Sequence, residues 1–114
     1  MYKISQLKFD KNGNLIITEN IIKKHIRDYL KQIGCKFWHN LQGLGCYEGL
    51  PDYEGVWKGK HFYIEAKSPR GTQRPGQVKF QELVESEGEL YILADNVEIV
   101  MKHIHLDGFI MPRT

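Results

Sequence analysis

The sequence predicts an α/β fold in which a mixed β-sheet is flanked by helices. Apolar residues recur at helical spacing in segments 19–33 and 75–87, whereas residues 61–67 alternate as in a β-strand. A continuous apolar run at 90–94 follows the second helix, which is typical of an interior strand in a partly parallel sheet. With 114 residues, the chain is long enough for a single domain, 1–114, with its own core.

We expect an N-terminal β-hairpin over residues 3–17 to precede the core of the domain at 18–103. Apolar residues flank Asn12-Gly13, a dipeptide that favours a two-residue hairpin turn. Thr18 then suits the N-cap of the first helix, and Gly34 suits its stop.

Glu19 stands at the head of the apolar stripe of this helix. On a wheel of about 100° per residue it falls in line with Ile22, Ile26 and Leu30. An acid in the first turn suits the helix dipole, whereas an acid on the buried face indicates a carboxylate directed toward the sheet. Because buried acids are seldom unpaired, we expect Glu19 to be the third carboxylate of a functional site.

The middle of the chain predicts three strands. Residues 36–40 form a short strand, and residues 53–57 and 61–67 form a hairpin around a tight turn. Asp52 lies at the beginning of this hairpin and Glu65 lies near its end. The hairpin is therefore expected to bring two carboxylates together.

Glu65 and Lys67 share one face of the second hairpin strand, because side chains alternate along a strand. Converging carboxylates form a hard-oxygen site suited to Mg²⁺. A lysine beside such an ion can position or activate a water molecule. Together, Asp52, Glu65 and Lys67 indicate metal-assisted hydrolysis of a phosphodiester.

The second long helix begins at Pro75, which suits the first helical position, and runs to about Glu87 before Gly88. Gln77 faces inward in the first turn of this helix. A buried glutamine is more often a satisfied polar group than a catalytic one. Gln77 is also expected to lie close enough to contact the carboxylates or an attacking water.

The C-terminal part predicts one further helix. The segment 95–98, Asp-Asn-Val-Glu, has the spacing of a capping box. The residues expected to face inward are Val97, Val100, Met101 and Ile104. The tail at 108–114 would pack through its apolar residues.

Two clusters of basic residues are candidates for contact with nucleic acid, although the net charge is only +2. The first cluster consists of Lys23, Lys24, Arg27, Lys31 and Lys36. The second follows the carboxylate-bearing strand and consists of Lys67, Arg70, Arg74 and Lys79. Basic residues bind phosphate only where they face a site, so a solvated helix face is an equally good interpretation of the first cluster.

The composition is that of a soluble globular protein, with 41% hydrophobic and 26% charged residues, and so excludes the disordered classes. No apolar stretch reaches membrane-spanning length, and the N-terminal residues lack the apolar core of a signal peptide. Cys35 and Cys46 are then expected to be reduced thiols in the cytoplasm.

The element order and these residues resemble the PD-(D/E)xK nuclease superfamily and, within it, the stand-alone VRR-NUC domains of phage and bacterial genomes. The resemblance covers roughly residues 18–103. The segments that carry it are Gly49-Leu50-Pro51-Asp52, Phe62 to Lys67, Gly71 followed by Gln77, and Gly88 before the strand at 90–94. It implies a restriction-endonuclease-like core.

The resemblance also implies roles for the matched residues. Asp52 and Glu65 would coordinate Mg²⁺ or Mn²⁺, helped by the backbone carbonyl of Ala66. Lys67 would hold or activate the attacking water and counter charge on the scissile phosphate. Glu19 would support the metal site, directly or through water.

Gln77 would fix the water or the lysine, and the reaction would leave a 5′-phosphate. Members of the family are similar to Holliday-junction resolvases, and some stand-alone ones are dimers that cut branched DNA. The resemblance therefore implies that the substrate is DNA, including branched DNA such as four-way junctions. It also implies that the protein acts as a homodimer. Contacts to DNA would come from Arg70, Arg74, Lys79 and Lys23.

A zinc site is one alternative to this interpretation. Its ligands would be Cys35, His39, Cys46 and His61. Their spacing fits none of the usual patterns of paired cysteines or histidines.

A non-catalytic nucleic-acid-binding module or a dimer adaptor of the same fold is a second alternative. It would use the basic clusters, and aromatic residues such as Trp38 or Trp57 would stack on bases. Such a module has no need of Asp52, Glu65 and Lys67 together. Unneutralised acids weaken binding to a phosphate backbone, so their presence favours the metal-dependent nuclease.

Overall fold

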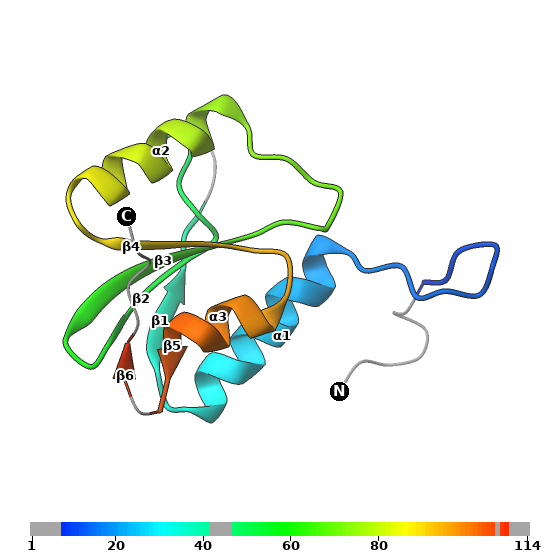
Figure 1. Cartoon of the computed structure of the whole chain (residues 1–114), viewed down its shortest axis with the longest axis horizontal. Helices are drawn as coiled ribbons and strands as arrows, with labels where there is room; N and C mark the ends of the chain where they lie inside the picture. The colour runs from blue at the N-terminus through cyan, green and yellow to red at the C-terminus, as the bar shows by residue number, and fades with distance from the viewer. Residues whose placement is uncertain (1–7, 42–46, 107, 110–114) are drawn as a thin grey trace.

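The structure, a computed structural model, describes residues 8–41, 47–106 and 108–109 of the chain. They form an α/β fold in which a four-stranded mixed sheet lies between helices (Figure 1). The sheet consists of β1 (Lys36–His39), β2 (Tyr53–Trp57), β3 (Lys60–Ala66) and β4 (Leu90–Ala94), in that order. The helices are α1 (Glu19–Gln32), α2 (Pro75–Ser86) and α3 (Val97–His103). The short strands β5 (Ile104–His105) and β6 (Gly108–Phe109) pair with each other.

The predicted hairpin in the middle of the chain is confirmed as β2 and β3. Trp57 pairs with Lys60, so Lys58 and Gly59 form a two-residue turn. Both turn residues have positive φ angles, 52° and 79°, which match the twist of the flanking strands. β1 and β2 are antiparallel, whereas β4 joins β3 in parallel after the chain has crossed through α2. The sheet is therefore mixed, as predicted.

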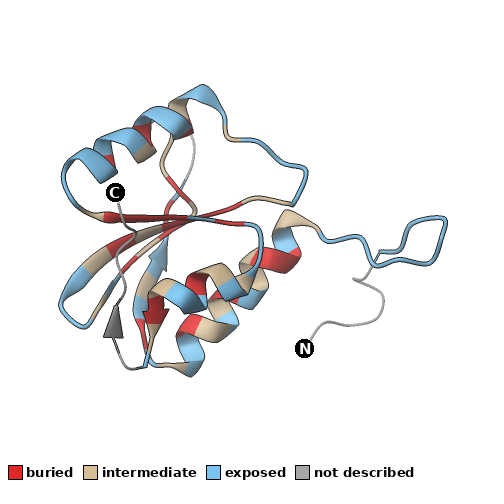
Figure 2. Ribbon diagram, in the orientation of Figure 1, coloured by how far each residue is buried: buried red, intermediate tan, exposed pale blue. Residues whose placement is uncertain are grey.

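Helices cover both faces of this sheet, with α1 and α3 on one side and α2 on the other (Figure 1). On the α1 side, Phe62 and Ile64 of β3 pack with Ile26 of α1 in the main core. On the α2 side, Tyr91 of β4 packs with Phe80 of α2 in a smaller cluster. Buried residues accordingly follow the strands and the inner sides of the helices (Figure 2).

The predicted N-terminal hairpin is confirmed only as a turn. Phe9 and Leu15 form a single antiparallel bridge, and Gly13 has a φ angle of 83°. The Asp10 carboxylate accepts hydrogen bonds from the backbone N–H groups of Asn12 and Asn14, each at 2.9 Å. This segment projects away from the sheet (Figure 1). The earlier part of the predicted hairpin, residues 3–7, lies outside the described residues.

The ends of the helices follow the predicted caps with one correction. The Thr18 side chain accepts a hydrogen bond from the Ile21 N–H at 3.2 Å and caps α1, as predicted. At α3, Asn96 rather than Asp95 is the N-cap, and its side chain accepts from the Ile99 N–H at 3.0 Å.

The inward face predicted for α3 is correct in part. Val100 is buried, and Ile104 is buried just beyond the helix in β5. Met101 is 42% exposed, so its predicted inward position is wrong. The tail predicted at 108–114 lies mostly outside the described residues. None of the helices in the described ranges is both long and apolar enough to cross a membrane.

Candidate metal centre

The Asp52 carboxylate is fixed at the end of β3. Asp52 lies just before β2, and its Oδ2 accepts a hydrogen bond from the backbone N–H of Ala66 at 2.8 Å. The buried Asn40 holds the backbone of this segment from the other side. Its side-chain amide donates to the Pro51 carbonyl at 3.1 Å, and its backbone N–H donates to the Asp52 carbonyl at 2.9 Å. The hairpin thus places the Asp52 carboxylate beside the peptide that follows Glu65.

Glu65 lies in β3 and is 1% exposed. Its Oε1 accepts a hydrogen bond from the Tyr91 hydroxyl at 2.8 Å. Its Oε2 is buried and has no hydrogen-bond partner among the described residues. A buried, unsatisfied carboxylate oxygen costs free energy, so this atom indicates a position where a cation would be stabilising.

The electrostatics of Glu65 are consistent with such a position. Burial raises the pKa of Glu65 above its ordinary value, and the neighbouring charge of Asp52 acts in the same direction. The Tyr91 hydroxyl, the Lys67 ammonium and the Gln73 side chain favour the ionised form, but their combined effect is smaller. A divalent cation would offset both the burial of Glu65 and its repulsion from Asp52.

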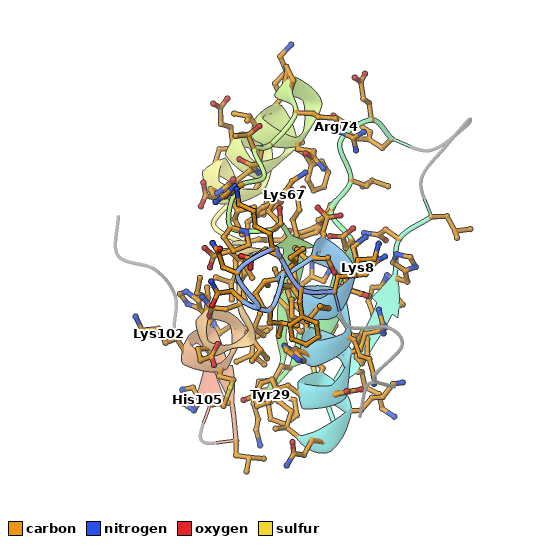
Figure 3. All side chains as sticks on the ribbon, turned by 90° about the vertical axis from the view of Figure 1, so that its right-hand side faces the viewer. Lys8, Tyr29, Lys67, Arg74, Lys102 and His105 are labelled. Carbon is orange, nitrogen blue, oxygen red and sulfur yellow. The ribbon has the colours of Figure 1, made fainter. Side chains whose placement is uncertain are left out.

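Lys67 follows β3 and lies next to Glu65. Its Nζ atom forms an ion pair with Oε2 of Glu65 at 3.9 Å, and its side chain is 15% exposed. Its backbone N–H donates to the Ala94 carbonyl at 2.9 Å, which extends the pairing of β3 with β4 beyond the strand end. Seen from the side, Lys67 lies between α2 and α1 (Figure 3). Asp52, Glu65 and Lys67 are therefore brought together at one end of the sheet.

Glu19 is less closely associated with this group than the sequence predicts. Its side chain is 42% exposed, so the expected burial is wrong. Lys23 separates it from Asp52: the Lys23 Nζ atom is 3.4 Å from Oε2 of Glu19 and 3.3 Å from Oδ1 of Asp52. Within the described residues, no group of three or more His, Cys, Asp or Glu side chains is arranged to hold a metal.

Lys23 therefore contacts carboxylates, whereas the sequence suggested contact with nucleic acid. Burial lowers the pKa of Lys23, but the charges and hydrogen bonds of Asp52 and Glu19 outweigh it and raise this pKa overall. The partly buried ammonium neutralises part of the Asp52 charge.

Replacing Lys23 by methionine should tighten Mn²⁺ binding to the site. The substitution keeps the aliphatic stem and removes the cation that competes for Asp52 Oδ1. The expected gain is a few-fold, since a partly exposed ion pair contributes up to about 1 kcal/mol. Isothermal titration calorimetry with Mn²⁺ measures it, with Lys24→Met, whose ion pair with Asp28 lies elsewhere on α1, as the matched control. Weaker Mn²⁺ binding by Lys23→Met would contradict this competition.

Gln77 is buried, as predicted, but it contacts the beginning of its own helix. Its Oε1 accepts a hydrogen bond from the backbone N–H of Arg74 at 2.8 Å, as part of a capping box at the N-terminus of α2. Gln77 and Glu19 belong to helices that cover opposite faces of the sheet, α2 and α1 (Figure 1).

Two polar residues near Glu65 were missed in the sequence. Tyr91 lies in an apolar run that predicts only a buried strand. Gln73 lies in the loop before α2, and its side-chain amide donates to Gln81 at 3.0 Å. Neither residue carries a signal in its local sequence, because both reach Glu65 through the crossover from β3 to β4.

The proposed DNA-contacting residues differ in their surroundings. Arg70, Arg74 and Lys79, which belong to the second cluster of basic residues, are exposed. In the first cluster, Lys24 pairs with Asp28 at 2.9 Å and Arg27 donates to the Tyr53 hydroxyl at 2.8 Å. These contacts favour the interpretation of the α1 cluster as part of the helix surface.

The structure does not favour the zinc alternative. Cys35 is a buried free cysteine, and burial raises the pKa of its thiol to about 11. His61 lies between two carboxylates, with Nε2 3.0 Å from Glu54 and Nδ1 2.5 Å from Glu89. Cys46 lies outside the described residues.

Comparison of the sequence with models of known protein families and with curated proteins found no match. The function is therefore inferred from the fold and from the chemistry of Asp52, Glu65 and Lys67.

Proposed function

We propose that this protein is a metal-dependent DNA endonuclease with a restriction-endonuclease-like core. The observation that carries the proposal is the buried Oε2 of Glu65, which accepts no hydrogen bond from the described residues and lies near the Lys67 ammonium, at the end of β3 where Asp52 is held. Two carboxylates and a nearby peptide provide the hard-oxygen ligands that Mg²⁺ and Mn²⁺ prefer. The residues present therefore fit such an ion.

In this proposal, Asp52 and Glu65 would hold the cation, and the carbonyl of Ala66 would add a further oxygen. The bound ion would supply Lewis-acid polarisation of the phosphodiester and a lowered pKa for water. Lys67 orients the attacking water and neutralises charge on the scissile phosphate. Glu19 acts indirectly, because Lys23 connects it to Asp52. Gln77 acts by fixing the start of α2.

The proposed substrate is DNA, with branched DNA such as four-way junctions as the preferred form. Exposed Arg70, Arg74 and Lys79 supply positive charge for the phosphate backbone. A domain of 114 residues offers little surface to surround a junction, which favours a homodimer that presents two metal centres.

The decisive experiment is cleavage of a DNA panel by the full chain in the presence of Mg²⁺ or Mn²⁺. The panel contains single-stranded, duplex, flap and four-way DNA. Two symmetric nicks in the four-way junction would indicate a dimeric resolvase, whereas a cut at the flap by a monomer would indicate a different structure-specific nuclease. DNA binding without cleavage of any substrate would contradict the endonuclease and favour the binding module.

Lys67→Ala should abolish cleavage of this panel and leave DNA binding measurable. The substitution removes the ammonium next to Glu65, while the backbone hydrogen bond to Ala94 remains. Cleavage assays and electrophoretic mobility shifts measure the two effects separately. Lys60→Ala, at the other end of the same strand, is the matched control and should cut normally. Normal cleavage by Lys67→Ala would remove this residue from the proposed mechanism.

A further inference from the structure

Tyr91 is held rigidly beside Glu65. It lies in β4 and is 4% exposed. Its ring stacks near that of Tyr63, with centroids 6.4 Å apart, and lies 6.4 Å from the ring of Phe80 in α2. Because these rings surround it, the phenol has little freedom to rotate, and its hydroxyl stays directed at Glu65.

The hydrogen bond from Tyr91 makes the two oxygens of Glu65 inequivalent. A phenol hydroxyl has one proton to donate, and it donates to Oε1 at 2.8 Å. Among the described residues, Oε2 accepts no hydrogen bond, and it lies 3.9 Å from the Lys67 ammonium. Rotation of the carboxylate about its last bond would break the Tyr91 contact. The hydroxyl therefore fixes the plane of the carboxylate and the direction in which its free oxygen faces a ligand.

We propose that Tyr91 is a positioning residue of the metal centre, an inference that rests on the proposed function. The Tyr91 hydroxyl orients the Glu65 carboxylate so that Oε2 would face a divalent cation. The Gln73 side chain supports this arrangement from the loop before α2, since it also favours the ionised form of Glu65. Partners that hold ligating carboxylates in this way commonly tune metal affinity.

A purely structural role for Tyr91 makes a different prediction. If the hydroxyl only satisfied a buried carboxylate, its removal would lower the stability of the fold but leave the affinity for metal unchanged. Metal affinity, measured without DNA, therefore separates the two roles.

The test is a titration of Mn²⁺ into the full chain by isothermal titration calorimetry. Tyr91→Phe keeps the ring and removes the hydroxyl, and it should weaken Mn²⁺ binding by about 10- to 100-fold. Tyr63→Phe is the matched control: its ring belongs to the same cluster, but its pKa responds to burial and to Glu89 and Glu54. This control should bind Mn²⁺ as the wild type does.

If circular dichroism shows that Tyr91→Phe does not fold, the titration of both proteins is repeated in sucrose, an osmolyte that favours the folded state. Wild-type Mn²⁺ affinity in the folded Tyr91→Phe would overturn the proposal.

The outcomes also separate this inference from the endonuclease. Weaker Mn²⁺ binding by Tyr91→Phe, in a protein that cuts none of the DNA panel, supports the positioning role and overturns the nuclease. If the wild-type protein cuts DNA but Tyr91→Phe binds Mn²⁺ with unchanged affinity, the nuclease is supported and the positioning role is overturned. A wild-type protein that binds no Mn²⁺ overturns both.

Discussion

Replacing Glu65 by glutamine is expected to abolish metal-dependent cleavage and, without metal, to stabilise the folded chain at pH 7. The carboxylate is buried with one oxygen unsatisfied, and burial raises its pKa above the ordinary 4.5. A raised pKa in the fold means that the protonated form is favoured there. Below pH 4.5, Glu65 is protonated in both the folded and the unfolded chain, and the fold has its full stability. This stability is lost as the pH rises through the pKa of Glu65 in the folded chain.

Glutamine has no charge to bury, so the gain in unfolding free energy should appear at pH 7 and disappear below pH 4.5. Its size should be at most about 1–3 kcal/mol, the typical cost of an unsatisfied buried group, because the glutamine amide removes the charge but still buries an unpaired polar atom. Urea denaturation with a chelator at several pH values measures this gain. Glu82→Gln, an exposed change in α2, should be neutral. Wild-type cleavage by Glu65→Gln would exclude Glu65 as a metal ligand.

Gly49→Ala should lower both the stability of the fold and the rate of DNA cleavage. Gly49 allows the segment that carries Asp52 to pack closely against the beginning of α2. Its φ angle is 84°, and an added Cβ would lie 2.2 Å from the carbonyl oxygen of Gly76 and 3.0 Å from the backbone nitrogen of Gln77. The backbone conformation should cost about 1–3 kcal/mol in an alanine, and the overlap about 1–3 kcal/mol more. The chain must shift to relieve this overlap, which displaces the segment that carries Asp52.

Gly59→Ala isolates the backbone contribution of this change. Gly59 has a φ angle of 79°, and an added Cβ there meets nothing within 4 Å. Urea denaturation should therefore show a smaller loss for Gly59→Ala than for Gly49→Ala, and the Gly59 variant should still cut DNA. Equal losses in the two variants would show that the contact with Gly76 is unimportant.

The part of the site that the sequence predicts correctly is the part set by local geometry. Glu65 and Lys67 share a face because the period of a strand is fixed at two residues. Asp52 joins them because a tight turn fixes the register of its hairpin. Tyr91 could not be predicted in this way, because its hydroxyl meets Glu65 only after β4 has paired with β3.

A helical wheel predicts which side of a helix faces inward but not which face of the sheet the helix covers. It therefore identified Gln77 as buried, but it could not show that α2 and α1 lie on opposite faces. It also placed Glu19 on the apolar stripe, but in the structure this side chain, in the first turn of α1, is 42% exposed. At α3, Asp95 and Asn96 are both good caps, and only the path of the chain selects Asn96.

The parallel pairing of β3 with β4 has a consequence for biosynthesis. Glu65 and Tyr91 are 26 residues apart, so the carboxylate is held only after the intervening helix has formed and the loop has closed. Contacts of this range form late, and on the ribosome they must wait until β4 has been synthesised. A nascent chain that has made the Asp52–Glu65 hairpin alone would hold its carboxylates loosely. The proposed metal centre should therefore form only once the sheet is complete.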